Sequence, residues 1–490
     1  MRSYFKKSIF LVFVIVLLGF AIRLYKLTSS PEGLYIDETS IAYNAYSIIS
    51  TGRDEHGTFM PLFFEAFGEY KLPIYIYLVA LTQIIIGVSD LAVRIPSLLF
   101  GTFSIFLIYL FTRELIGDYK ISILSSFLLA VSPWHYQFSR PGFEASVGLF
   151  FLILALYLFF RGLNKNSSRY IGFSFISFVI TLYSYNSARI VTPVTALILF
   201  ILYFRHFEIR NWIKIGLIAF ILAIPFLNFS FSREGLVRAR QVSIFFQKDT
   251  SPLHFFSNYY KNISPFYLFK NGDPTFNHLT PYRMSLIHTV EAPFFFMGLI
   301  YSVWMKSKKL LFLVSLFFIS LIPPSVASLN PHALRGMLAL SSTPIISAVG
   351  FGCFLSLFKR KYLRLIMVII FMSMVLISTL LFLDRYHNQY IPSSGWDWQV
   401  GIKRAGARVL AIENNYNDIY LDLDQRIIAS LWYFKIDPGL YQKGLTGKYH
   451  INEPISSEHG LYVGLAPQRG RLLEYVYYPN NTVAYGMWEF

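Results

Sequence analysis

Two adjacent carboxylates, Asp37 and Glu38, stand in the segment YIDET, shortly after the first apolar run of the sequence. Neighbouring side chains point in different directions on a helix or turn, so these acids are predicted to hold two separate roles. A carboxylate beside an apolar wall gains proton affinity, as a general base requires. The pair is therefore a candidate for a general base and for a second role, such as orienting an acceptor or capping the turn. A solvated acidic loop is the alternative.

Cations gather at the predicted starts of later apolar segments. Arg140 and Glu144 lie in SRPGFEAS, Arg189 lies in YNSARIVTP, and His332 and Arg335 lie in NPHALRG. Helix N-termini present exposed N–H groups and partial positive charge, and arginines beside them suit a phosphate. The alternative is that the arginines anchor helix ends to lipid headgroups, or that Arg140 pairs with Glu144.

Metal and nucleotide chemistry find less support. The segment TGRDEHG offers His56 beside acids, but a single histidine without recognisable ligand spacing is weak evidence, so a divalent metal stays open and no cofactor is predicted. The segment GEYKLP adds Lys71 to the candidate phosphate ligands. Neither a GxxxxGK[ST] loop nor a dinucleotide glycine pattern is present. Cys353 is the one cysteine, so a disulfide within the chain is excluded.

Composition indicates a polytopic membrane protein. Of the 490 residues 55% are hydrophobic and 14% are charged, whereas soluble domains carry roughly a quarter charged residues. The net charge of +16 resides in short clusters between apolar runs, which indicates orientation in a membrane and excludes nucleic acid as a partner. Apolar runs fall near residues 8–25, 72–88, 91–111, 121–136, 143–160, 170–184, 190–204, 213–230, 291–305, 309–323, 336–357 and 364–383.

A consistent topology emerges if 72–88 lies in the outer interface, leaving eleven spans. The short loops on one side then each carry two or more Lys or Arg, which predicts that this side is cytoplasmic. These loops are Met1–Lys7, Arg113–Lys120, Arg161–Arg169, Arg205–Lys214, Lys306–Lys309 and Lys359–Arg364. We therefore expect a multi-pass protein of the plasma (inner) membrane whose N-terminus lies in the cytoplasm. The first apolar run is expected to act as an uncleaved membrane anchor.

The predicted fold class is an all-α polytopic membrane protein with a small extracytoplasmic α/β domain. A transmembrane domain over 1–384 carries two large outer segments, 26–90 and 231–290. The chain turns polar over 385–490, where a helix is expected near 399–413 and strands near 418–424, 460–466 and 482–490.

The DE pair at 37–38, the segment Lys71–Pro73, VRIPS at 93–97 and the outer Arg140…Glu144 turn resemble the C-type fold membrane glycosyltransferases. The most similar group is the protein O-mannosyltransferase and aminoarabinose transferase superfamily, including its bacterial members. The resemblance covers roughly residues 10–350 and is strongest over 31–195. One departure is Leu72, where relatives commonly carry a second proline, and the region after about 385 resembles no family member.

The resemblance implies an inverting transferase with a lipid-phosphate sugar donor, in which Asp37 acts as base or positions the acceptor. It also implies juxtamembrane helices in the first outer loop. The expected reaction moves a sugar from a polyprenyl-phosphate carrier to a protein, lipid or glycan acceptor. The phosphate would be stabilised by cationic side chains, namely Arg140, Arg189, Arg335, His332 and Lys71. A secondary transporter or lipid flippase is the alternative, although such proteins often show internal repeats and ionisable residues near mid-membrane.

Overall fold

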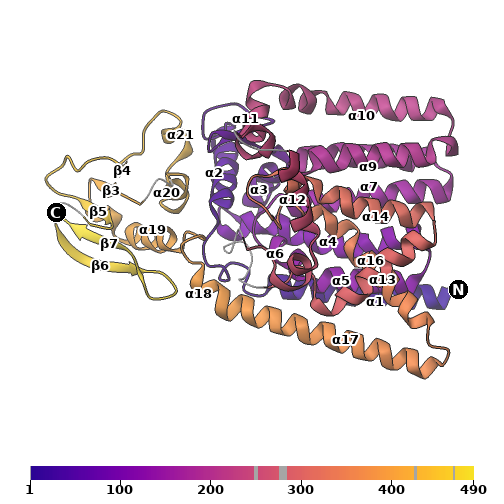
Figure 1. Cartoon of the computed structure of the whole chain (residues 1–490). Coiled ribbons are helices and arrows are strands. Elements are labelled where there is room, and N and C mark those ends of the chain that lie inside the picture. Colours follow the sequence, from indigo (N-terminus) through magenta and orange to yellow (C-terminus); the bar gives the residue numbers. More distant parts are fainter. Residues whose placement is uncertain (1, 248–251, 275–283, 424–426, 467–469) are drawn as a thin grey trace. The chain divides into compact units, whose positions relative to one another are not determined.

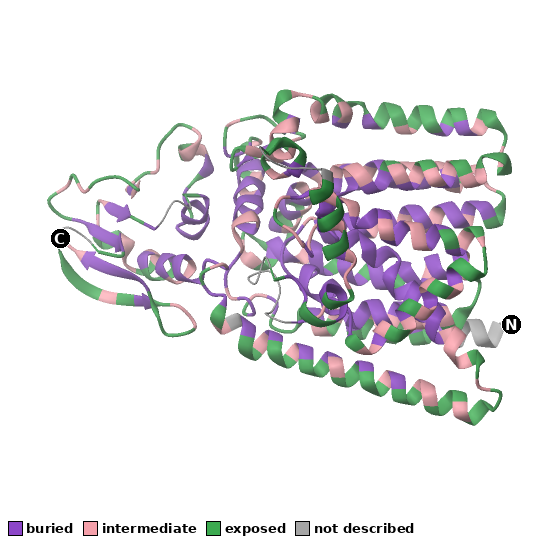
Figure 2. Ribbon diagram, viewed as in Figure 1, coloured by how far each residue is buried: buried purple, intermediate pink, exposed green. Residues whose placement is uncertain are grey.

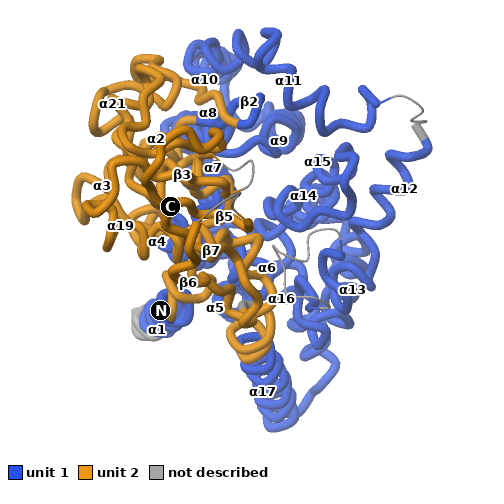
Figure 3. The backbone as a smooth tube through the Cα atoms, turned by 90° about the vertical axis from the view of Figure 1, so that its left-hand side faces the viewer, with its two compact units in different colours: residues 1–25, 67–72, 97–383 blue, residues 26–66, 73–96, 384–490 orange. Residues whose placement is uncertain are grey.

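The computed structural model describes residues 2–247, 252–274, 284–423, 427–466 and 470–490. The chain forms two compact units, each assembled from separate stretches (Figure 3). Unit 1 comprises residues 1–25, 67–72 and 97–383, and unit 2 comprises residues 26–66, 73–96 and 384–490.

The membrane part of the molecule is helical, and many of its helices run roughly parallel (Figure 1). The apolar helices that form unit 1 or enter it are α1 (Arg2–Leu24), α4 (Asp90–Ile116), α5 (Tyr119–Val131), α7 (Ala145–Lys165), α8 (Ser168–Ser184), α9 (Ala188–Tyr203), α10 (Ile209–Ser230), α13 (Ala292–Trp304), α14 (Lys308–Ser320), α16 (Thr343–Ser356) and α17 (Lys361–Asp384). Each corresponds to one of the spans expected from the sequence, so the polytopic fold is confirmed.

Six helical stretches among the described residues are long and apolar enough to cross a membrane. They are Asp90–Ile116, Ala145–Lys165, Ala188–His206, Ile209–Ser230, Lys308–Val326 and Lys361–Tyr390. The described part also holds shorter apolar helices, among them α3 (Pro73–Ile86). With 14 residues, α3 is about 21 Å long, less than the roughly 30 Å of a hydrocarbon core. It is no shorter than α5, α13 and α16, which have 13, 13 and 14 residues, so its length does not distinguish it from the spans and its place in the interface stays a prediction.

Two of the helices expose most of their apolar surface. The most apolar windows of α10 and of the stretch Lys361–Tyr390 are only 17% and 22% buried, and both helices are largely green in Figure 2. Apolar side chains in such numbers are stable on an outer surface only against hydrocarbon.

Glycine allows α13 and α16 to pack backbone against backbone. A Cβ added at Gly298 would lie 2.1 Å from the carbonyl oxygen of Ile346, and one at Gly350 would lie 1.8 Å from that of Phe294. Close approach through small residues is how membrane helices associate when water supplies no hydrophobic drive. Any larger residue at these two positions would separate the helices.

The connections of unit 1 contain further short elements. They are the helices α6 (Pro133–Phe138), α11 (Arg233–Val242), α12 (Pro252–Ile263) and α15 (Ile322–Val326), the 3₁₀ helices η1 (Phe204–His206), η2 (Ile244–Phe246), η4 (Thr289–Glu291) and η5 (Met337–Ser341), the π-helical turn η3 (Tyr267–Asn271), and the strand β2 (Glu69–Lys71). Parts of the expected outer segment 231–290 lie outside the described residues.

Two expected helix starts were wrong. The sequence placed Pro141 in the first turn of one span, with Arg140 just before it, and Arg335 at the start of another, whereas α7 begins at Ala145 and α16 at Thr343. Tight turns intervene in both cases, the first closed by the Phe143 N–H donating to the Pro141 carbonyl at 2.8 Å. Arg189 alone of the three lies in a first helical turn, that of α9.

Unit 2 joins the first large loop to the C-terminal region. Its helical elements are α2 (Ile36–Thr51), α3, the first turns of α4, the π-helical turn η6 (Arg385–Tyr390), α18 (Ile391–Ser393), α19 (Val400–Ile412), the 3₁₀ turn η7 (Glu413–Asn415), α20 (Ile427–Tyr433) and α21 (Pro438–Tyr441), and it includes the strand β1 (Phe64–Ala66). Helix α2 packs on α3, α20 and α21, so stretches far apart in sequence share one core.

The C-terminal region is a small α/β fold, as expected. Its sheet has the order β4-β3-β5-β7-β6, with β3 parallel to β4 and β5, and with β7 antiparallel to β5 and β6. The strands are β3 (Ile419–Leu421), β4 (Tyr449–Ile451), β5 (Leu461–Gly464), β6 (Arg471–Tyr477) and β7 (Val483–Glu489). Helix α19 and three of the strands match the sequence expectation, β4 and β6 were missed, and residue 424 at the end of one expected strand lies outside the described residues.

Candidate active site

The first turn of α2 carries the acidic pair in unit 2. Asp37 is partly exposed there, whereas Glu38 is fully buried. The Glu38 carboxylate accepts a hydrogen bond from the Tyr35 N–H at 2.9 Å and so caps the helix. The structure thus separates the two acids, and Glu38 fills the capping role rather than a substrate-facing one.

Arg94, from the VRIPS segment, completes the burial of Glu38. Its Nε lies 3.0 Å from a Glu38 oxygen, and its side chain is 1% exposed. The same guanidinium donates to the carbonyl oxygens of Leu27, Pro31 and Gly33 at 2.7, 2.9 and 2.5 Å. A buried charge is stable only when paired and fully hydrogen-bonded, and Arg94 meets that condition. This arginine therefore fixes the path of the loop that leads to Asp37.

Residues of the C-terminal region also contact the loop that leads to Asp37. The Arg94 guanidinium carbon lies 5.9 Å from the centre of the Trp398 ring, and Tyr35 meets that ring edge-on at 6.0 Å. The Tyr433 hydroxyl accepts a hydrogen bond from the Leu34 N–H at 2.8 Å. The residues just before Asp37 are therefore positioned by the C-terminal part of unit 2.

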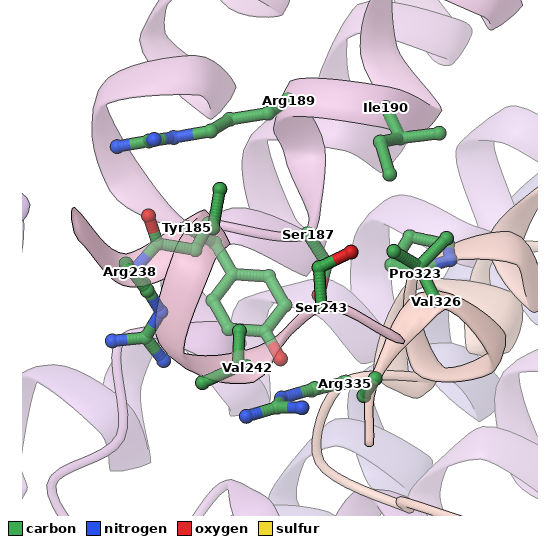
Figure 4. A pocket seen from close by; sticks show the side chains of 13 residues that line it. Tyr185, Ser187, Arg189, Ile190, Arg238, Val242, Ser243, Pro323, Val326 and Arg335 are labelled. Carbon is green, nitrogen blue, oxygen red and sulfur yellow. The ribbon is translucent and has the colours of Figure 1, made fainter. Parts of the chain in front are cut away.

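A pocket of about 280 Å³ opens in unit 1 where α8 ends and α9 begins (Figure 4). Three of its lining residues are arginines, Arg189 at the start of α9, Arg238 on α11 and Arg335 in the turn before η5. No acid is among the described residues that line it, which we call the arginine pocket. Such a concentration of cations suits a phosphate group. The full lining is Tyr185, Asn186, Ser187, Arg189, Ile190, Arg238, Ala239, Val242, Ser243, Pro323, Val326, Ala327 and Arg335.

Arg238 is balanced by one carboxylate, that of Glu69 on β2, with which it forms an ion pair. Sequence reasoning missed Arg238 as a site residue. The available signal was an excess of arginine in REGLVRARQV, a segment predicted to lie on the outer side, where few cations are expected. Arg189 donates to the Gly235 carbonyl at 3.4 Å and its guanidinium carbon lies 5.4 Å from the Phe226 ring centre, neither of which neutralises its charge.

Arg335 is positioned by the turn that precedes it. The Tyr185 hydroxyl donates to the Leu334 carbonyl at 2.7 Å, and the Asp273 carboxylate accepts from the Ala333 N–H at 2.7 Å. Burial, reinforced by repulsion from Arg238, lowers the pKa of Arg335 to about 10. Burial also raises the pKa of Tyr185 above its usual value. At neutral pH the pocket therefore presents a charged guanidinium beside a protonated phenol.

The other predicted site residues of unit 1 do not line the arginine pocket. Arg140 is 1% exposed and stacks over Tyr136, with 4.9 Å between its guanidinium carbon and the ring centre, and Glu144 occupies the N-cap position of α7. His332 is buried, and its Nδ1 accepts from the Arg335 N–H at 3.5 Å. Lys71 is buried at the end of β2, two residues from Glu69, so that both side chains leave the same face of the strand.

No cluster of three or more His, Cys, Asp or Glu side chains suited to a metal occurs within the described ranges. His56 has Glu55 at 3.9 Å, and the neighbouring Asp54 accepts instead from the N–H groups of His56 and Thr58.

The comparisons with known proteins agree with this description. Residues 71–229 match the family model of dolichyl-phosphate-mannose-protein mannosyltransferases. No curated protein sequence matches the chain.

Solved structures share the fold at low sequence identity. ArnT from Cupriavidus metallidurans in the apo state matches with a TM-score of 0.59 and 9% identity, over 99% of this chain and 98% of that one. The same protein bound to undecaprenyl phosphate matches with a TM-score of 0.55 and 10% sequence identity, over 97% of each chain. A third match is the archaeal oligosaccharyltransferase AglB from Archaeoglobus fulgidus, in complex with an inhibitory peptide and a dolichol-phosphate. It has a TM-score of 0.58 and 14% sequence identity, over 88% of this chain. This chain spans 64% of the length of that archaeal protein.

The match of residues 71–229 to the mannosyltransferase model and the fold shared with ArnT agree with each other. Both findings support the resemblance to membrane glycosyltransferases noted in the sequence.

Proposed function

We propose that this protein is an inverting glycosyltransferase that moves one sugar from a polyprenyl-phosphate donor to an acceptor hydroxyl at the outer face of the membrane. The observation that carries the proposal is the arginine pocket, in which Arg189, Arg238 and Arg335 converge without an acid in the lining. The ArnT and AglB structures that share the fold were solved with undecaprenyl phosphate and dolichol-phosphate, which supports a lipid phosphate as the donor group.

In the proposed reaction the acceptor oxygen attacks the anomeric carbon of the sugar as the bond from that carbon to the phosphate oxygen breaks. Attack from the opposite face inverts the anomeric configuration. Asp37 would take the hydroxyl proton, a contribution of typically ~10²–10⁴-fold. The arginines would stabilise the charge that develops on the departing phosphate, and fixed donors in a water-poor cavity do this without reorganisation.

The predicted topology explains why the donor must be a lipid. Nucleotide sugars are made in the cytoplasm, whereas Asp37 and the arginine pocket are predicted to face outward. An isoprenoid carrier can present its sugar across the membrane, whereas a nucleotide cannot cross. The absence of nucleotide-binding loops from the sequence agrees with this proposal.

The test is direct transfer by the purified protein. Supplied with peptide, lipid and glycan acceptors, the protein should release polyprenyl phosphate from a panel of polyprenyl-monophosphate sugars as the sugar passes to an acceptor hydroxyl. It should give no product from the corresponding nucleotide sugars. Asp37→Asn should lower release by about 10²–10⁴-fold while the protein stays folded. Turnover of a nucleotide sugar in the absence of lipid would refute the mechanism.

The orientation has its own test. In a Cys353→Ser background, single cysteines at Lys120, Lys165 and Lys309 should be shielded from an impermeant thiol reagent, and a cysteine at Asp37 should react with it. Reaction from opposite faces on the two sides of residues 72–88 would show that this segment spans the membrane and would refute the proposed topology.

A further inference from the structure

A second and larger cavity, of about 640 Å³, lies in unit 1 away from the arginine pocket. It is enclosed by the loops that join α4 to α5, α13 to α14 and α16 to α17, and we call it the basic cavity. Helix α14 has 13 residues and begins beside the basic cavity, whereas α15 at its other end lines the arginine pocket. A helix of that length separates its ends by about 20 Å, so the two cavities lie at opposite ends of the bundle.

The basic cavity has an excess of positive charge. Lys120, Lys309 and Arg364 line it against one acid, Asp118. Asp118 accepts hydrogen bonds from the N–H groups of Lys120 and Ile121 at 2.7 and 3.2 Å and so caps α5. Its charge is therefore directed largely toward the helix terminus rather than toward the cations.

Neutral groups hold two of the three cations in place. The Lys309 ammonium donates to the Glu114 carbonyl at 3.4 Å, and the Arg364 Nε donates to the Phe358 carbonyl at 2.6 Å. A carbonyl orients a cation without cancelling its charge. The sequence from Met305 to Arg364 contains no Asp or Glu. The acids near these cations are Asp118 and, at the end of α4, Glu114, which attracts Lys309 but also forms an ion pair with Arg161.

The rest of the lining is largely apolar. It includes Leu115, Ile121, Leu310, Val349 and Leu355. Farther along α17, Phe371 stacks on Phe351 of α16 with 4.3 Å between ring centres, and this contact belongs to an aromatic cluster that closes the helices together. Arg364 lies about 10 Å before Phe371 along the helix, at 1.5 Å per residue. The cavity is thus cationic near the loops and apolar toward the middle of the bundle.

An amphiphile with an anionic head has the matching shape and polarity. Basic recesses between membrane helices on the cytoplasmic side are suited to the phosphate heads of anionic lipids, and this is the end of the bundle predicted to be cytoplasmic. A free phosphate would satisfy the cations but leave the apolar walls uncovered. We propose that the basic cavity binds the head group of an anionic phospholipid of the inner leaflet, independently of the transferase reaction.

The chain carries a natural reporter for this site. Cys353, the single cysteine of the sequence, lines the basic cavity and is partly exposed. A bound lipid should therefore slow the reaction of its thiol with a membrane-permeant maleimide. The experiment uses the full-length wild-type chain in phosphatidylcholine nanodiscs, with and without phosphatidylglycerol, and needs neither sugar donor nor acceptor.

We expect phosphatidylglycerol to protect Cys353, and each loss of a cation in Lys309→Gln or Arg364→Gln to weaken protection by about fivefold. The matched controls are Lys165→Gln and Arg169→Gln, exposed cations predicted to lie at the same membrane face but outside the cavity. Equal labelling rates in pure phosphatidylcholine would show that a variant keeps its fold, and native mass spectrometry of retained phosphatidylglycerol gives a second readout.

Several results would overturn the assignment. They are equal labelling with and without phosphatidylglycerol, equal loss of protection in the cavity and control variants, and protection by inorganic phosphate or by polyprenyl phosphate in place of phosphatidylglycerol. Loss of transferase activity by itself bears on the proposed function and leaves this test unaffected.

Discussion

Arginines differ between the two units of the molecule: Arg94 in unit 2 is buried, whereas the three arginines of the pocket in unit 1 are half-buried. The Arg94 guanidinium in unit 2 donates hydrogen bonds to a carboxylate and to three carbonyl oxygens, so its donors are satisfied within the protein. In unit 1, Arg189, Arg238 and Arg335 surround a pocket whose described lining contains no acid, with Glu69 alone paired to Arg238. A buried arginine with a complete set of partners stabilises a fold, whereas arginines around a cavity with a deficit of acids are available to an anion.

The acids of α2 make the sharpest test of this contrast. Asp37→Asn should lower transfer by about 10²–10⁴-fold with little change in stability, because only the charge of a partly exposed group is removed. Glu38→Gln should instead lower the thermal stability, since the carboxylate that pairs with Arg94 is lost. Initial rates and thermal unfolding of both variants are the measurements, and wild-type turnover by Asp37→Asn would remove Asp37 from the mechanism.

Arg94→Gln should reduce the stability of the protein by about 3–5 kcal/mol, because it leaves the Glu38 charge buried without its partner. The control is Arg404→Gln, since Arg404 is a half-exposed partner of Glu32 and such pairs contribute roughly 0–1 kcal/mol. Unfolding in detergent is the readout. If both variants unfold alike, the Arg94 network is not the structural element described here.

Arg238→Gln and Arg335→Gln should leave unfolding nearly unchanged and weaken the binding of polyprenyl phosphate by about 10–100-fold, as expected for hydrogen bonds to a charged group. Lysine at either position should rescue binding incompletely, since it lacks the bidentate fork. Arg240→Gln is the matched control, because Arg240 lies on the same helix but is exposed and outside the pocket. Equal binding by all three variants would exclude the pocket as the donor site.

The pH dependence should be the smallest effect. The pKa of Arg335 is lowered to about 10 by burial and by Arg238, so the side chain is charged at neutral pH. A bound phosphate favours the charged form of Arg335. Binding should therefore be constant from about pH 8, where the phosphate monoester is fully ionised, to about pH 9, and should weaken as the pH rises through 10. Titrated binding of polyprenyl phosphate to wild type and to Arg335→Gln would show whether this step belongs to Arg335.

The sequence predicted the helical bundle well because long apolar segments and the charge bias of loops are local signals. It also predicted α19 and three strands, since amphipathic periods are read within a few residues. The sequence could not reveal the role of Arg238 or the partner of Glu38. Arg94 and Glu38 are separated by 56 residues, and Arg238 and Glu69 by 169, so neither pairing leaves a local signal. Such pairings depend on how the chain returns on itself. The helices expected to start at Arg140 and Arg335 begin five and eight residues later, at Ala145 and Thr343, because turns resemble helix starts in sequence.

Unit 2 is built from three stretches, and the last begins at Asp384, long after the second ends at Pro96. At about 5–20 residues per second, roughly 15–60 s of synthesis separate the loop that carries Asp37 from the C-terminal region that holds it. Throughout that interval Arg94 and Glu38 can pair, but Trp398 and Tyr433 do not yet exist. The first loop therefore cannot complete its core while the membrane helices insert, and a chain that ends before Asp384 has the bundle but lacks the residues that complete the first loop.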